Sequence, residues 1–112
     1  MNNYKLYEQN WLKEVDQIIH ANLQNSNFNL MDLAAKLYLS KSTLYRKITK
    51  LSGMSPNDYI RKKRLAKAKA MLESGSAYNL GEVARNVGYQ RKDYFVKLYI
   101  QTYNEPPSAL RV

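Results

Sequence analysis

The sequence contains no cysteine, and no stretch of it is apolar over a long run. Without cysteine there can be no disulfide framework and no metal site built on thiolates. A membrane span needs roughly 18 apolar residues in a row, so we expect no transmembrane segment. The first residues, MNNYKLYEQNW, lack the apolar stretch of a signal peptide, which argues against secretion. These absences together indicate a cytoplasmic protein.

Residues suited to catalysis are also scarce. His20 is the only histidine, and it has neither a cysteine nor an evident carboxylate constellation to work with. The sequence has no phosphate-binding loop and no dinucleotide-binding fingerprint. A surface position on a helix is therefore the simpler interpretation of His20. We expect no enzyme activity, no cofactor and no metal ion.

Acidic residues are few: 9 Asp and Glu stand against 18 Lys and Arg, which gives a net charge of +9. A charge of this size points to a polyanionic partner, either nucleic acid or an anionic membrane surface. The excess is concentrated, because residues 33–72 hold eleven basic side chains and Asp58 alone among acids. A solvated surface is the alternative interpretation, but such a surface normally mixes the two signs.

The spacing of apolar residues and the turn residues between them predict an all-α fold. We expect helices over residues 8–24, 30–37, 41–51, 57–73, 80–87 and 91–103. Asn29, Ser40 and Asn79 are suited to cap helix starts, and Ser55 precedes a proline at a favoured first helical position. Gly53 and Gly88 are suited to turns that follow helices.

The chain also repeats itself. Leu33 and Ala34 correspond to Val83 and Ala84 at a spacing of fifty residues, and Leu44 corresponds to Phe95 at fifty-one. One extra residue near Gly88 explains the shift. Each copy reads as a short helix, a tight turn and a longer helix, which is the helix-turn-helix arrangement.

The second helix of such a unit anchors one face to the domain and can present the other to the DNA major groove. In the first copy, Leu44, Ile48 and Leu51 form the anchoring stripe. The outward residues, which we expect to contact DNA, are Lys41, Ser42, Tyr45, Arg46, Thr49 and Lys50. Arg46 is the best candidate for a base contact, because its fork matches the two acceptors of guanine. Tyr45 could instead pack on the flank of the helix.

In the second copy, four residues look buried: Phe95, Leu98, Tyr99 and Thr102. The expected outward set is Arg91, Lys92, Tyr94 and Lys97. Asp93 is unusual there, because phosphates repel a carboxylate. It could accept a hydrogen bond from cytosine or stabilise the helix start, and we favour the helix start.

The run RKKR at residues 61–64 crowds the first half of the long helix, and we expect Arg61 and Lys62 to contact phosphates. Solubility and nuclear localisation are alternative interpretations of that run.

Residues 29–111 resemble the AraC/XylS-type DNA-binding domain. The resemblance rests on SKSTLYR at the start of the first reading helix, GMSP at the turn after it, and VARNVGY and YFVK in the second half. The first half is most similar to the output domain of Bacteroides-type hybrid two-component regulators. Asn104 stands where the family usually has glycine, and Ile100 where it commonly has lysine; Pro106 and Leu110 also depart from its pattern.

This resemblance implies two helix-turn-helix subdomains, residues 29–56 and 75–112, joined by a connecting helix at 57–74 and preceded by a leading helix and linker at 1–28. The reading helices at about 41–51 and 91–103 are expected to enter successive major-groove segments, roughly 34 Å apart. The implied partners are double-stranded DNA, RNA polymerase and a sensor or receiver domain of the full-length protein, with no membrane partner for this fragment.

A basic RNA-binding or anionic-membrane-binding helical module is the alternative. The basic helix at 57–73 could lie on anionic lipid, and the ten tyrosines could stack on RNA bases. Neither alternative explains why the short-helix, turn, longer-helix unit occurs twice. The sequence therefore favours sequence-specific binding of duplex DNA.

Overall fold

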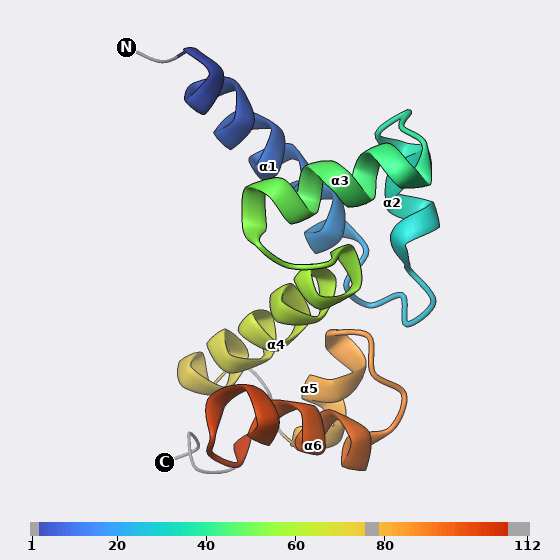
Figure 1. The fold of residues 1–112 in the computed structure, drawn as a ribbon. Helices are drawn as coiled ribbons and strands as arrows, with labels where there is room; N and C mark the ends of the chain where they lie inside the picture. The colour runs from blue at the N-terminus through green and yellow to red at the C-terminus, as the bar shows by residue number, and fades with distance from the viewer. Residues whose placement is uncertain (1–2, 76–78, 108–112) are drawn as a thin grey trace. The chain divides into compact units, whose positions relative to one another are not determined.

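The computed structural model describes residues 3–75 and 79–107, and within these ranges it contains six helices and no strand (Figure 1). The helices are α1 (Asn3–Ala21), α2 (Leu30–Lys36), α3 (Lys41–Ser52), α4 (Pro56–Ser74), α5 (Leu80–Asn86) and α6 (Lys92–Tyr103). The predicted all-α fold is confirmed, and the bounds of α2 to α6 differ from prediction by at most one residue at an end. Leu110, which departs from the family pattern, lies outside the described residues.

The predicted bounds of the first helix are wrong at both ends. α1 begins at Asn3 instead of residue 8 and ends at Ala21 instead of residue 24. Its end is set by Asn22, whose side-chain amide donates to the Ile18 carbonyl at 2.7 Å. Leu23 is buried as the apolar pattern suggested, but it lies in the loop after the helix.

The predicted caps are present. The Asn29 side chain accepts from the N–H groups of Met31 and Asp32, and the Asp32 carboxylate accepts from the Asn29 N–H, which completes a capping box. Ser40 accepts from the Thr43 N–H at 3.1 Å. Asn79 accepts from the Glu82 N–H at 2.9 Å. Each bond satisfies a backbone donor that a helix start leaves without an intrahelical partner.

A residue in the left-handed conformation follows each of the helices α3 and α6. Gly53 follows α3 with φ of 75°, and Asn104 follows α6 with φ of 59°. Asparagine tolerates this conformation better than most residues, so its replacement of the usual glycine leaves the turn intact. Tyr38, in the turn between α2 and α3, also has a positive φ of 56°.

The chain divides into two compact units, one of Met1–Asn22 with Phe28–Lys63 and the other of Leu23–Asn27 with Arg64–Val112. The boundary cuts α4 between Lys63 and Arg64, so this one continuous helix contributes to both units. The loop segment Leu23–Asn27 belongs to the second unit although the helices on either side of it belong to the first.

In the first unit, α2 packs against α1 and α3. Val15 of α1 and Leu44 and Ile48 of α3 are fully buried. The Tyr59 hydroxyl of α4 donates to the Asp16 carboxylate of α1 at 2.6 Å. Burial, and after it the hydrogen bond and the charge of Asp16, raise the pKa of Tyr59. These contacts hold the helix-turn-helix formed by α2 and α3 on a support made of α1 and the start of α4.

In the second unit, α5 packs against α6, and the second half of α4 closes the core. The buried residues of this core are Leu65, Ala68, Leu72, Val83, Ala84, Val87, Phe95, Leu98 and Tyr99. The prediction that Thr102 is buried is wrong, because Tyr103 packs against the core instead and Thr102 is exposed. The inward stripe of α6 follows steps of four from Phe95 through Tyr99 to Tyr103.

Arg64 is the largest departure from the sequence-based interpretation, which placed it with the basic residues that crowd the surface of the long helix. It is 5% exposed. Its guanidinium donates to the carbonyls of Leu23 at 2.6 Å and Val87 at 2.8 Å through Nη1, and to that of Asn25 at 3.0 Å through Nη2. Burial lowers the pKa of Arg64. The side chain therefore joins α4, the loop and the end of α5 within the second unit.

Candidate nucleic-acid interface

The outward face of α3 carries all six residues that the sequence predicted there. Lys41, Ser42, Tyr45, Arg46, Thr49 and Lys50 are exposed, whereas Leu44 and Ile48 on the opposite face are fully buried and Leu51 is half-buried. Four of the six line a hollow of about 450 Å³: Lys41, Ser42, Tyr45 and Arg46. The sequence of α3 contains no acidic residue. This face therefore combines a concave surface, hydrogen-bond donors and uncompensated positive charge.

Lys47 belongs to α3 but faces elsewhere. Its ammonium group lies 4.2 Å from the centre of the Trp11 ring of α1, and the side chain is half-buried. A cation over an indole face is attracted by the ring's quadrupole. Lys47 therefore helps to hold α3 against α1, a role that local spacing could not reveal because Trp11 is 36 residues away in the chain.

The four residues of the RKKR run lie in four different environments. Arg61 and Lys62 are exposed as predicted, although Arg61 is bound to Asp58 at 2.6 Å, which partly neutralises it. Lys63 is half-buried and pairs with Asp16 at 3.3 Å. Arg64 is buried, so it is not available to phosphates. Within this run, Lys62 is the basic residue that best fits the predicted phosphate contact, because it is exposed.

The outward face of α6 carries the second predicted set. Arg91, immediately before the helix, and Lys92, Tyr94 and Lys97 within it are all exposed, while Phe95, Leu98 and Tyr99 are buried. The ring of Tyr94 meets that of Tyr89 edge to face, with centroids 6.1 Å apart. The two helix-turn-helix copies thus bury equivalent stripes and expose equivalent faces.

Asp93 lies in the first turn of α6 and pairs with Arg91. The Arg91 Nε donates to one Asp93 oxygen at 3.3 Å, and Nη2 donates to the other at 2.8 Å. The hydrogen bond from Arg91 is the main reason that the pKa of Asp93 is lowered, and its charge and nearby backbone N–H groups lower it further. The backbone contribution agrees with the helix-start role; the contact with Arg91 was not foreseen.

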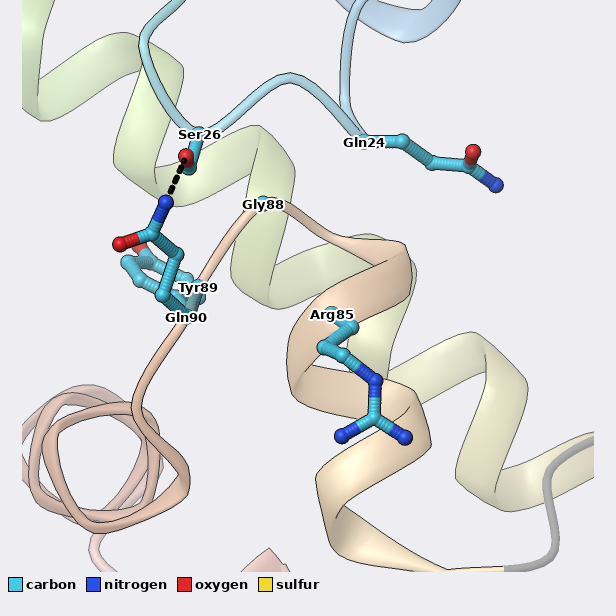
Figure 2. A pocket seen from close by; sticks show the side chains of 6 residues that line it. All are labelled: Gln24, Ser26, Arg85, Gly88, Tyr89 and Gln90. Atoms are coloured by element: carbon cyan, nitrogen blue, oxygen red, sulfur yellow. Dashed lines mark hydrogen bonds between the residues drawn. The ribbon is translucent and has the colours of Figure 1, made fainter.

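The turn before α6 is supported by the loop of residues 23–27. Figure 2 shows the Gln90 amide donating to the Ser26 hydroxyl, at 3.1 Å, beside a hollow of about 290 Å³. Gln24 donates to the Asn86 side chain at 3.1 Å. Gly88, with φ of 91°, lies so close to Arg64 that a Cβ there would collide with its Nη1. From the sequence we predicted only that this loop separates two helices.

Within the described part of the chain, no three His, Cys, Asp or Glu side chains gather as a metal site would require. Nor is any described helix both long enough and apolar enough to cross a membrane.

Comparisons with known proteins agree with this geometry. A family model described as a helix-turn-helix domain matches residues 33–112. A protein named histidine kinase P4, from Formosa agariphila, is 31% identical over 97 residues, which are 87% of this chain and 7% of that protein. The chain therefore spans a small part of that curated relative.

Two solved structures share the fold. One is the C-terminal domain of the two-component response regulator yesN from Fusobacterium nucleatum, with a TM-score of 0.80, 30% identity, and coverage of 92% of this chain and 99% of that one. The other is the DNA-binding domain of AdpA in complex with a target DNA, with a TM-score of 0.77, 28% identity, and coverage of 88% and 86%.

Proposed function

The chain belongs to the AraC/XylS-type helix-turn-helix family, and from this premise we propose that it is the sequence-specific DNA-binding domain of a bacterial transcription regulator. In this proposal α3 and α6 enter successive major-groove segments of one duplex. Residues 29–56 and 75–112 act as the two reading subdomains, and residues 57–74 connect them. The similarity to a domain solved on its target DNA supports this function.

The observation that carries the proposal is the division of α3 into two faces. Its apolar stripe is fully buried at Leu44 and Ile48, and its other side exposes Lys41, Tyr45 and Arg46 around one hollow. A reading helix has to satisfy both demands at once, since one face holds the domain together while the other contacts base edges. Arg46 is assigned a guanine contact, and Thr49 and Lys50 extend the same face.

Two of the exposed basic residues of α4 are assigned to the DNA backbone. Arg61 and Lys62 contact phosphates, which position a protein on the duplex without specifying sequence. On α6, Lys92, Tyr94 and Lys97 complete the second contact surface together with Arg91. Ile100 is 42% exposed where a lysine would add charge, so the second subdomain contributes less to electrostatic attraction than the first.

The matched residues make up only 7% of histidine kinase P4, which supports the proposal that this chain is one domain of a longer protein. We propose that a sensor or receiver domain in that protein controls DNA binding, that RNA polymerase is the partner at the promoter, and that the protein acts in the cytoplasm. The relatives named histidine kinase and two-component response regulator support this assignment.

Selection from a random duplex library, followed by competition in a gel-shift assay, tests the function. We expect selected duplexes to contain two half-sites one helical turn apart, and to resist competition by random duplex, single-stranded RNA or anionic vesicles. The control is Lys67→Ala, which removes one exposed charge from α4 outside the assigned contacts. This variant should select the same duplex sequence as the wild type. Stronger competition by RNA or vesicles than by the selected duplex would overturn the proposal.

A further inference from the structure

An exposed ion pair stands at the start of α6. Arg91 occupies the position immediately before the helix, Asp93 is two residues further on, and their side chains are 76% and 71% exposed. Exposed pairs of this kind contribute little to the stability of a fold. Arg91 also makes no side-chain hydrogen bond that caps the helix. A structural role therefore does not account for the pair.

The pair leaves a defined part of the guanidinium available. Arginine has five N–H donors in a planar fork. Asp93 takes Nε–H and one N–H of Nη2, so both N–H groups of Nη1 and the second one of Nη2 remain. The remaining donors include one from each terminal nitrogen, which lie side by side at the end of the fork. This end is the part that matches two adjacent acceptors on one planar partner.

In the major groove, guanine presents two adjacent acceptors, N7 and O6, whereas adenine presents one acceptor beside an amino donor. We propose that Arg91, held in place by Asp93, reads a guanine in the half-site that α6 contacts, and that Asp93 is a positioning residue for this specificity. The inference rests on the proposed function and assigns a base to a residue that was otherwise expected only to contact DNA.

The charge of Asp93 and the fixed orientation of the Arg91 side chain both support this assignment. Because Arg91 lowers the pKa of Asp93, the carboxylate is ionised at neutral pH and keeps both oxygens as acceptors. A carboxylate on this face weakens the general attraction to phosphates, and both of its oxygens accept from Arg91. In this inference Asp93 therefore favours binding only through Arg91. A fork already held in one orientation loses less side-chain freedom when it binds. Lys92 and Lys97, as point charges on flexible stems, lack that advantage.

The test compares duplexes that differ only at one base pair. Sequences are first selected with the wild-type chain and with Arg91→Ala, which locates any guanine that depends on Arg91. Affinities for the four base pairs at that position are then measured for both proteins. We expect Arg91→Ala to lose about 5- to 150-fold in preference for guanine, the range for one bidentate contact. Arg91→Lys should keep affinity for random duplex but lose part of the preference, because an ammonium on a flexible stem lacks the planar fork that Asp93 holds in place.

Asp93→Ala distinguishes positioning from simple attraction. We expect its affinity for random duplex to equal or exceed that of the wild type, because a negative charge is removed, while its preference for guanine falls several-fold. Arg85→Ala removes an exposed arginine from α5 and is the matched control, with an unchanged preference expected. Circular dichroism of each variant checks that the total helix content is unchanged, and both altered side chains are largely exposed, so folding should be retained.

Different failures have different meanings. Equal losses for Arg91→Ala on all four duplexes would make Arg91 a phosphate contact and overturn the inference alone. An unchanged guanine preference in Asp93→Ala would also overturn it, as would a cytosine preference that depends on Asp93 but not on Arg91. If the wild-type chain selects no duplex sequence at all, the proposed function fails, and this inference fails with it.

Discussion

At the scale of single residues, burial decides what each basic side chain does. Arg46 and Lys62 are exposed, Lys47 lies over a tryptophan ring, and Arg64 is enclosed by backbone carbonyls. A count of charges assigns all four to the same basic surface. Only the exposed ones can release counterions from DNA, so the electrostatic footprint is smaller than the net charge suggests.

Substitution of Arg46 should change which sequence is preferred. We expect Arg46→Ala to weaken binding to the selected duplex by about 1–3 kcal/mol and to relax the preference at one base pair, because a bidentate guanine contact is lost. Affinities for duplexes with each base at that position provide the measurement. Lys62→Ala is the matched comparison: as a phosphate contact, it should weaken binding to all duplexes alike and reduce the slope of affinity against salt.

A uniform loss of affinity in Arg46→Ala would reassign that residue to the DNA backbone. A loss confined to one base pair in Lys62→Ala would contradict its assignment in the same way.

Removal of Arg64 should destabilise the second unit without any involvement of DNA. Arg64→Met keeps much of the side-chain volume but leaves the carbonyls of Leu23, Asn25 and Val87 without this donor. Buried acceptors that lose their partners cost about 1–3 kcal/mol each, so we expect the free energy of unfolding to fall by about 3 kcal/mol. Urea denaturation measures it. Lys67→Met, exposed on the same helix, should change it by less than about 0.5 kcal/mol; equal effects would refute the role given to Arg64.

At the scale of elements, caps and turns define where each helix begins and ends. Local bonds from Asn29, Ser40 and Asn79 satisfy the first backbone donors of three helices. The turns after the short helices share one backbone arrangement, since Tyr38 and Gly88 occupy equivalent positions and both have a positive φ. In each turn the next N–H, that of Leu39 or Tyr89, donates to an alanine carbonyl in the helix before it. The two copies of the motif therefore share this turn and differ in the residue that adopts the left-handed conformation.

Loss of the α3 cap should weaken the reading helix. In Ser40→Ala the Thr43 N–H loses its acceptor, which should lower the free energy of unfolding by about 1 kcal/mol. Chemical denaturation followed by circular dichroism provides the measurement. Ser42→Ala, which changes an exposed serine within the same helix, should alter stability by no more than about 0.5 kcal/mol. If the two variants are equally stable, the hydroxyl of Ser40 does not cap the helix in solution.

The glycines after α3 and α5 should respond differently to substitution. Gly53→Ala adds only left-handed strain, about 1–2 kcal/mol, because nothing lies within 4 Å of the new Cβ. Gly88→Ala adds the same strain and a collision with Arg64 and the Leu23 carbonyl, so we expect a loss of about 3 kcal/mol or more. Thermal and urea denaturation of both variants measure the difference. A Gly88 variant as stable as the Gly53 variant would mean that Arg64 and the loop move aside easily.

At the scale of the whole molecule, α4 is one uninterrupted helix of 19 residues that contributes to both compact units. A helix of that length measures about 28 Å at 1.5 Å per residue. In the proposed binding mode one chain supplies both reading helices, in place of the two subunits of a symmetric dimer.

The spacing between half-sites should therefore be restricted. Five base pairs inserted between the selected half-sites turn the second one to about the opposite side of the duplex, where a helical connection does not let α6 follow. We expect affinity to fall to that of a duplex with one intact half-site, as measured by titration at fixed salt. Duplexes with five substituted base pairs and unchanged spacing are the control. Equal affinity for the inserted and original duplexes would show that the units bind independently.

The sequence by itself determined the all-α fold, the caps, the duplicated motif and the exposed faces of α3 and α6. These follow from local spacing, because a helix repeats every 3.6 residues and a cap is read within four positions. Only the tertiary structure decided that Arg64 is buried, that Lys47 lies over Trp11, that Thr102 is exposed, and that the loop of residues 23–27 supports the second turn. Arg64 meets carbonyls 41 and 23 residues away, and contacts of that span arise from packing, which no local pattern records.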